Sequence, residues 1–175
     1  MENKKELFTK SDLLRISTIF GFTVLTLDII QYLVSPGTIM NSNSFWDNIK
    51  YLIWAIGIFY ALKWFHLRNP QTPAIKYFGF TLRIASLVSL FDIFFAMLYF
   101  NVFNPAGKAQ FVDLIMQMNP NLTTYYPGMD LKDQFLSNFN IIFALSLYFS
   151  YLFMFMFYSV FYVLFLKLLF KPKSK

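Results

Sequence analysis

Residues 141–166 read IIFALSLYFSYLFMFMFYSVFYVLFL, and no charged side chain interrupts them. A helix needs roughly 20 mostly apolar residues to cross the hydrocarbon core of a bilayer. The strands of a membrane barrel are instead segments of about ten residues in which apolar and polar side chains alternate. Because this run is longer and does not alternate, it favours a membrane-spanning helix over a barrel strand.

Similar apolar stretches lie before this run and predict further spans. The expected spans are 13–35, 45–67, 76–103 and 137–170. The spacing of Thr9 and Asp12 is typical of a capping box before the first span, and Asp130 and Asp133 precede the last. We therefore predict an all-α integral membrane four-helix bundle that forms one transmembrane domain over residues 1–175.

The composition agrees with a membrane protein. Hydrophobic residues make up 57% of the 175 residues and charged residues only 14%. A soluble domain is roughly 45–50% apolar and about 25% charged, and a disordered chain is less apolar still. The chain has no cysteine, which excludes a disulfide scaffold and a cysteine-ligated metal site. We expect no metal and no cofactor.

The distribution of basic residues predicts the orientation. They gather before the first span, around residues 68–75 and after the last span, whereas Lys50, Lys108 and Lys132 lie on the other side. Because cytoplasmic loops are enriched in Lys and Arg, both termini and the 68–75 connection are expected in the cytoplasm. The 36–44 and 104–130 connections then face outward.

The outer connection contains a predicted short amphipathic helix at about 105–118, between the third and fourth spans. Its apolar residues recur at i, i+3, i+4 and i+7, namely Phe111, Leu114, Ile115 and Met118. Such a helix either lies along the outer membrane surface or caps the bundle and buries these four residues. The segment 120–136 is expected to be a loop.

Two acidic residues fall inside predicted spans and need an explanation. A charge at the centre of a bilayer costs at least about 2.5 kcal/mol on insertion scales, so intramembrane acids are candidates for function. Gln31 shares a helix face with Asp28, and Ser89 and Tyr99 share a face with Asp92. If the first and third helices are adjacent, the two carboxyl groups approach each other at similar depth.

These intramembrane polar candidates allow a functional and a structural interpretation. Asp28 and Asp92 form a proton or cation site, or they contact a polar ligand. Alternatively, each carboxyl group bonds a polar side chain on a neighbouring helix and fixes the packing. In a further alternative, the Lys50 side chain extends toward Asp28 at the outer edge.

A second set of candidates lies at the cytoplasmic end of the second and third spans. They are Lys63, His66, Arg68, Lys76 and Arg83. Such basic residues bind anionic lipid headgroups or a partner, or they only set the topology. A lone histidine without carboxylate or cysteine ligands nearby does not make a metal site. No nucleophile or phosphate-binding motif is present, so no catalytic residue is assigned.

The middle of the chain resembles a known family. The resemblance rests on Gly57–Arg68 (GIFYALKWFHLR), Lys76–Arg83 (KYFGFTLR) and Tyr99–Pro105 (YFNVFNP). These segments are similar to the four-helix inner-membrane proteins of Bacteroidota catalogued as domain of unknown function 4199. The resemblance implies a bacterial inner (cytoplasmic) membrane and four spans, and it implies no activity. Asn104 stands where the family pattern has an Asp, and His66 stands at a Lys- or Tyr-like position.

The sequence favours a non-enzymatic role as an accessory or assembly subunit of a cell-envelope system. One alternative is a small transporter or carrier of a proton, cation or lipid-linked substrate that uses Asp28 and Asp92. Another is a membrane enzyme that acts on lipid near His66 and Arg83. The expected partners are the lipid bilayer and either a membrane protein or a second copy of the chain. Nucleic acid is not expected.

Overall fold

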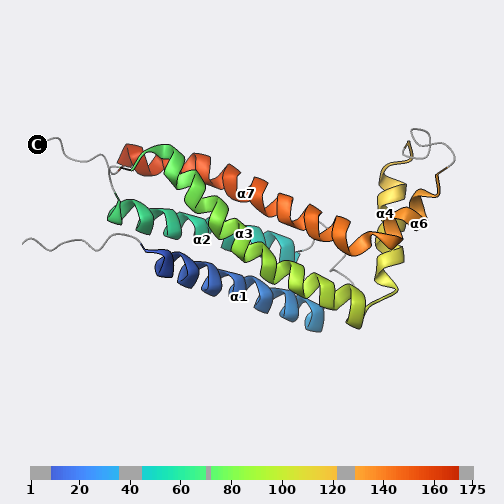
Figure 1. The fold of residues 1–175 in the computed structure, drawn as a ribbon. Helices are drawn as coiled ribbons and strands as arrows, with labels where there is room; N and C mark the ends of the chain where they lie inside the picture. The colour runs from blue at the N-terminus through green and yellow to red at the C-terminus, as the bar shows by residue number, and fades with distance from the viewer. Residues whose placement is uncertain (1–8, 36–44, 70–71, 122–128, 170–175) are drawn as a thin grey trace, which may run out of the picture.

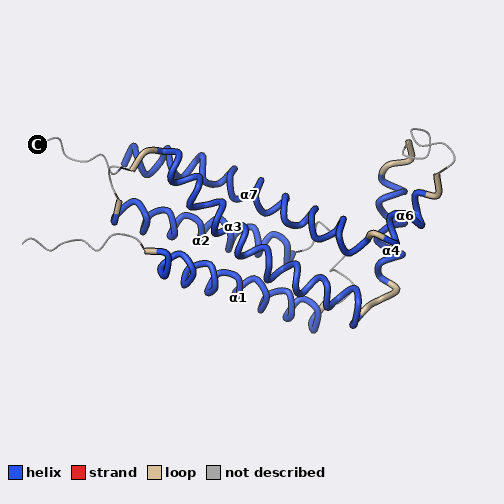
Figure 2. The backbone as a smooth tube through the Cα atoms, in the orientation of Figure 1, coloured by secondary structure: helices blue, strands red, loops and turns tan. Residues whose placement is uncertain are grey.

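The computed structural model describes residues 9–35, 45–69, 72–121 and 129–169, and the regular structure within these ranges is entirely helical (Figures 1 and 2). The elements are α1 (Lys10–Val34), α2 (Phe45–Arg68), α3 (Ala74–Leu98), the π-helical turn η2 (Tyr99–Phe103), α4 (Gly107–Met118), α6 (Leu131–Ser137) and α7 (Phe139–Leu169). The capping box predicted for the first helix is confirmed. The Asp12 amide donates to Thr9 Oγ1 at 3.2 Å, and the Thr9 amide donates to Asp12 Oδ2 at 2.9 Å.

Three helical segments of the described chain are long and apolar enough to cross a membrane. They are Lys10–Val34, Ala74–Phe103 and Phe139–Leu168. The sequence predicts a fourth span in α2, which has 24 residues but does not belong to this set. The reason lies in its polar ends, because Asp47 and Lys50 follow its start and Lys63 precedes its end.

The long helices lie side by side along most of their length (Figure 1). α3 packs along both α1 and α7, and α2 packs mainly against α7. The start of α1 meets the end of α2, where Arg68 Nη1 lies 3.0 Å from Asp12 Oδ2. The end of α7 reaches the start of α3, where Lys167 Nζ lies 5.9 Å from the centre of the Tyr77 ring. Both the first and the last helical turns are therefore at one end of the molecule.

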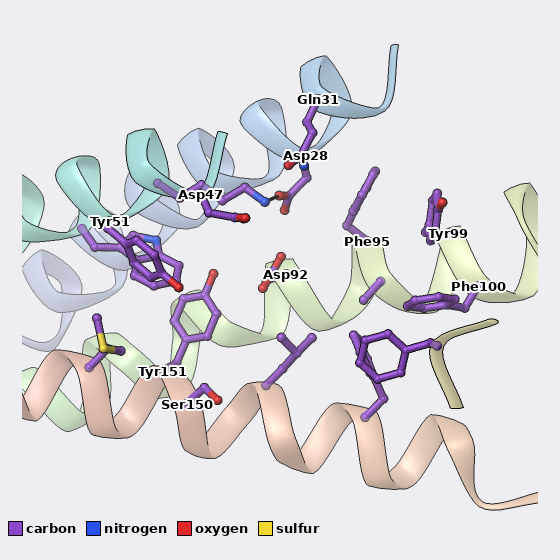
Figure 3. A pocket seen from close by; sticks show the side chains of 17 residues that line it. Asp28, Gln31, Asp47, Tyr51, Asp92, Phe95, Tyr99, Phe100, Ser150 and Tyr151 are labelled. Atoms are coloured by element: carbon purple, nitrogen blue, oxygen red, sulfur yellow. Dashed lines mark ion pairs between the residues drawn. The ribbon is translucent and has the colours of Figure 1, made fainter. Parts of the chain in front are cut away.

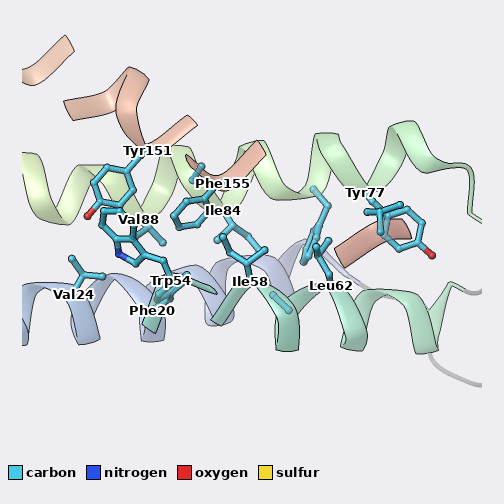
Figure 4. Packing of buried hydrophobic residues seen from close by; sticks show 14 of the residues in the cluster. Phe20, Val24, Trp54, Ile58, Leu62, Tyr77, Ile84, Val88, Tyr151 and Phe155 are labelled. Atoms are coloured by element: carbon cyan, nitrogen blue, oxygen red, sulfur yellow. The ribbon is translucent and has the colours of Figure 1, made fainter. Parts of the chain in front are cut away.

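Aromatic side chains make much of the contact between these helices (Figure 4). The ring of Phe20 stacks on Phe155 at a centroid distance of 5.6 Å, and Trp54 lies 4.6 Å from Tyr151. Gly57 permits the close approach of α1 and α2, since a Cβ atom there would lie 2.9 Å from Phe20 Cζ. Lipid is as apolar as these side chains, so close packing contributes more to helix association here than the hydrophobic effect.

The outward face of α7 carries exposed apolar side chains at intervals of about one helical turn. They include Ile141, Leu145, Phe149, Phe153, Phe157, Phe161 and Phe165. A soluble protein rarely exposes so continuous an apolar surface. This face suits contact with lipid.

The region after α3 differs from the sequence prediction in two places. The third predicted span does not remain α-helical to residue 103, because the Asn104 amide bonds the Tyr99 carbonyl at 2.7 Å and closes a π turn. The predicted loop at 120–136 is wrong in its second half. There, Asp130 caps α6 by accepting a hydrogen bond from the Asp133 amide at 3.1 Å.

The helix predicted at 105–118 begins at Gly107, and its inward face is centred differently from the prediction. Val112 is 1% exposed, whereas Leu114 is 40% and Met118 is 71% exposed. Phe111 turns inward, where its ring lies 5.1 Å from that of Phe143 on α7. The four predicted residues therefore do not form one buried stripe.

Candidate functional site

A cavity of about 290 Å³ lies between α1, α2, α3 and α7, with one wall supplied by Phe111 of α4 (Figure 3). Asp28 and Gln31 reach it from α1, and Asp92 and Tyr99 reach it from α3 and η2. It lies toward the end of the molecule that carries α4 and α6. In the predicted orientation, this is the outer end.

Asp28 and Lys50 form an ion pair at the cavity between α1 and α2. The side chain of Asp28 is 2% exposed and that of Lys50 is 16% exposed. The pair uses Asp28 Oδ1, while Oδ2 has no hydrogen-bond partner among the residues that the structure describes. The alternative in which Lys50 reaches Asp28 is therefore realised, and it leaves half of the carboxylate unsatisfied.

Asp92 adds a second acidic group within reach of this pair. It interacts electrostatically with both Asp28 and Lys50, and Figure 3 shows its carboxyl group pointing into the space that Asp28 faces. Asp47 also lines the cavity, from the first turn of α2. Asp28 and Asp92, when both are ionised, carry one negative charge more than the ammonium group of Lys50 balances.

Two further buried polar atoms at this cavity have no hydrogen-bond partner within the described chain. They are the hydroxyl group of Tyr151 and Nε1 of Trp54. Tyr151 is 1% exposed and Trp54 is 8% exposed, and the Tyr151 hydroxyl points toward Asp92 (Figure 3). Buried polar groups in proteins are nearly always hydrogen-bonded. Asp92 is the group nearest in interaction to the Tyr151 hydroxyl, which leaves Nε1 of Trp54 as the one of these two atoms without an assigned contact within the described chain.

The remaining walls are largely aromatic. Phe95 and Phe100 from the end of α3 and from η2, Phe143 from α7 and Tyr51 from α2 line the cavity together with Trp54. Aromatic faces attract cations, and the attraction strengthens where water is excluded. No group of three or more His, Asp or Glu side chains in the described chain is arranged to hold a metal ion.

Four of the five intramembrane candidates line this cavity. Asp28, Gln31, Asp92 and Tyr99 come together, and the Tyr99 hydroxyl also accepts a hydrogen bond of 2.9 Å from Asn104 Nδ2. Ser89 is the exception. It is fully buried, but it lies outside the cavity lining, and its hydroxyl donates to the Ser86 carbonyl at 3.0 Å.

The sequence predicted only part of what α2 contributes to the cavity. Asp47 is typical of the start of a helix, and Lys50 was predicted only as a partner for Asp28. Yet Asp47, Lys50, Tyr51 and Trp54 follow the spacing i, i+3, i+4 and i+7, which places them on one helix face. This spacing is the sequence pattern from which the shared helix face could have been predicted. Tyr151 carried no such signal, because it sits in a helix with aromatic residues on every side.

The candidates predicted at the cytoplasmic end do not form one site. His66 is 3% exposed, and its Nδ1 lies 2.5 Å from the Tyr77 hydroxyl in the core. Arg68 pairs with Asp12 and lies over the Trp64 ring at 4.5 Å. Lys76 and Arg83 are exposed, and Lys63 is half-buried. His66 is thus separated from the surface on which Lys76 and Arg83 lie.

Comparisons with protein-family models, with curated proteins and with solved structures gave no match. The family resemblance of residues 57–105 consequently stays a prediction.

Proposed function

We propose that this protein is a multi-pass membrane protein that binds a small organic cation in the cavity between α1, α2, α3 and α7. The observation that carries the proposal is an excess of carboxyl groups in a buried, aromatic-lined cavity where Asp28 Oδ2 has no partner within the described chain. A cationic occupant would compensate that excess, and the aromatic walls would hold it.

The membrane arrangement is part of the proposal. We infer that α2 is a fourth span, because it packs alongside the three apolar helices and supplies Trp54, Ile58 and Leu62 to their shared core. Four passes agree with the position of the first and last helical turns at one end. The cytoplasmic side is then the end with Arg68 and Lys167, in a bacterial inner membrane. The cavity then lies toward the outer side.

The cavity changes which of the sequence-based hypotheses is preferred. The accessory-subunit hypothesis rested on the lack of a catalytic constellation and on large apolar faces, which lipid contact also explains. A cation-binding cavity built around Asp28 and Asp92 instead favours the carrier hypothesis, for which binding is the first step.

The proposal is tested by binding of butylammonium to the purified protein in a nonionic detergent. Trp54 lines the cavity, so its fluorescence reports occupancy, and a Trp54→Phe variant identifies its share of the signal. We expect Asp92→Asn to weaken binding at least tenfold, about 1.4 kcal/mol, because it removes a charge that faces the cation. Asp113→Asn is the matched control, since Asp113 lies on α4 outside the cavity lining and should leave affinity unchanged.

A test of the Asp28 charge needs a double variant that also removes the charge of Lys50. Asp28→Asn alone leaves Lys50 buried without its ion-pair partner, so Asp28→Asn with Lys50→Gln is the variant to test. It removes one charge of each sign and should preserve folding. Undiminished butylammonium binding in Asp92→Asn, or no binding by the unaltered protein, would contradict the proposed function.

A further inference from the structure

A second cavity of about 250 Å³ lies beside the acidic one, between α4, α6 and α7. Its lining is almost wholly apolar and includes Val112, Ile115, Phe135, Phe139 and Ile142. The two cavities share the side chains of Phe111, Phe143, Leu147 and Ser150. They are therefore neighbours across one thin wall of side chains.

The helices that enclose the apolar cavity are held together outside it. Lys132 Nζ of α6 lies 2.7 Å from Asp113 Oδ1 of α4. The ring of Phe139 contacts those of Phe100 and Phe111, with centroids 4.9 and 5.9 Å apart. The ion pair thus joins α6 to α4, and Phe139 joins α7 to both η2 and α4.

We propose that the two cavities form one site for a single-chain amphiphile with an ammonium head and an alkyl chain. The head lies among Asp28, Asp47 and Asp92, and the chain passes Phe143 into the apolar cavity. This inference rests on the proposed function, because the acidic cavity must bind the head. An anionic head is disfavoured by the neighbouring carboxyl groups, and a neutral head would require one of these carboxyl groups to be protonated.

The test compares butylammonium, hexylammonium and octylammonium by isothermal titration calorimetry, corrected for their partition into empty detergent micelles. Burial of each additional methylene group tightens binding up to about fourfold. We expect octylammonium to bind at least tenfold more tightly than butylammonium. Equal affinities of the two amines would overturn the inference while leaving the proposed function intact, whereas no binding of either would overturn both.

A matched pair of variants tests where the alkyl chain of the ligand lies. Ile142 lines the apolar cavity, and its neighbour Ile141 is 65% exposed on the outward face of α7. Ile142→Trp should fill the apolar cavity. It should abolish the increase in affinity from butylammonium to octylammonium but preserve the affinity for butylammonium. Ile141→Trp should preserve both the increase and the affinity for butylammonium. If Ile142→Trp does not fold, Ser146→Leu narrows the same cavity. If the folded variant still binds octylammonium more tightly than butylammonium by the same factor as the unaltered protein, the alkyl chain does not lie in the apolar cavity.

The source of such an amphiphile is distinguished by a further arm of the same titration. Lysophosphatidylethanolamine presents the ammonium group on a lipid headgroup, and octylammonium presents it free. If the ammonium alone is recognised, octylammonium binds more tightly, because the phosphate of the lysolipid meets the same carboxyl groups. Tighter binding of the lysolipid would assign the site to a membrane lipid. Both results support an amphiphile with an ammonium head, and binding of neither refutes it.

Discussion

His66 and Tyr77 form a buried polar pair where α2 ends and α3 begins. Their side chains meet at 2.5 Å, and Phe65 packs its ring against both Tyr77 and Phe80 at centroid distances of 5.1 and 4.6 Å. The contact joins two helices across the short 69–73 connection. Its residues were recognised in the sequence only as part of a basic segment, since a buried partner for His66 cannot be read from spacing alone.

Tyr77→Phe should destabilise the protein, because it removes the hydroxyl group that bonds His66 but keeps the ring. Loss of one partner of a buried hydrogen bond costs about 1–3 kcal/mol. The apparent Tm in detergent is therefore expected to fall by several degrees. Tyr60→Phe is the control, since Tyr60 is 63% exposed. Equal Tm values for Tyr77→Phe and the unaltered protein would show that the contact contributes nothing to stability.

At the scale of elements, the junction of α4 and α6 combines an ion pair with aromatic packing. Lys132 is 49% exposed and Asp113 is 46% exposed, so solvent screens their interaction strongly. The hydrogen bond and charge of Asp113 nevertheless raise the pKa of Lys132 above its ordinary value of 10.5. The ion pair is accordingly lost as the pH rises through the raised pKa of Lys132, because the ammonium group then loses its charge.

The pKa of Lys132 can be measured from the NMR titration of ¹³C-dimethylated lysines. We expect Lys132 to titrate above pH 10.5 in the unaltered protein and at lower pH in Asp113→Asn, because the hydrogen bond and the negative charge are both removed. Added salt should reduce the difference between the two proteins. A Lys132 titration that does not respond to Asp113→Asn would mean that the ion pair does not form in solution.

The elements could be predicted where local rules suffice. The long apolar runs and the Thr9 cap predicted the start of α1 and the extent of α7, because caps and apolar length act within one segment. Asp130 was interpreted as a residue before the last span, and α6 was not predicted. The π turn at Tyr99–Phe103 could not be predicted, since its hydrogen bonding depends on how η2 packs against α4 and α7. α6 is only seven residues long, and the polar residues around it masked its pattern.

The candidate site was predictable in its acids but not in its shape. Asp28 and Asp92 stood out because charge is expensive in an apolar span. Their meeting required α1 and α3 to be neighbours, which is a tertiary fact that the sequence allowed but did not determine. The aromatic wall and the adjoining apolar cavity arise from three or more helices at once, and no periodicity within one helix reveals them.

At the scale of the whole molecule, the orientation is open to direct measurement. The cysteine-free chain allows single cysteines to be labelled cleanly in intact cells. A membrane-impermeant maleimide should react with Asn119→Cys and should leave Thr72→Cys unlabelled until the membrane is permeabilised. The reason is that the distribution of basic residues predicts a cytoplasmic connection between α2 and α3. Labelling of Thr72→Cys from outside would reverse the orientation.

The ion pair between Asp28 and Lys50 has a consequence for how the chain is made. α1 leaves the ribosome before α2, so the carboxyl group of Asp28 reaches the insertion machinery before its ammonium partner has been synthesised. An isolated acid in a span is costly to release into lipid. With α2 as the proposed fourth span, retention of α1 at the insertion site until α2 arrives would let the two helices leave as a hairpin in which Asp28 already pairs with Lys50.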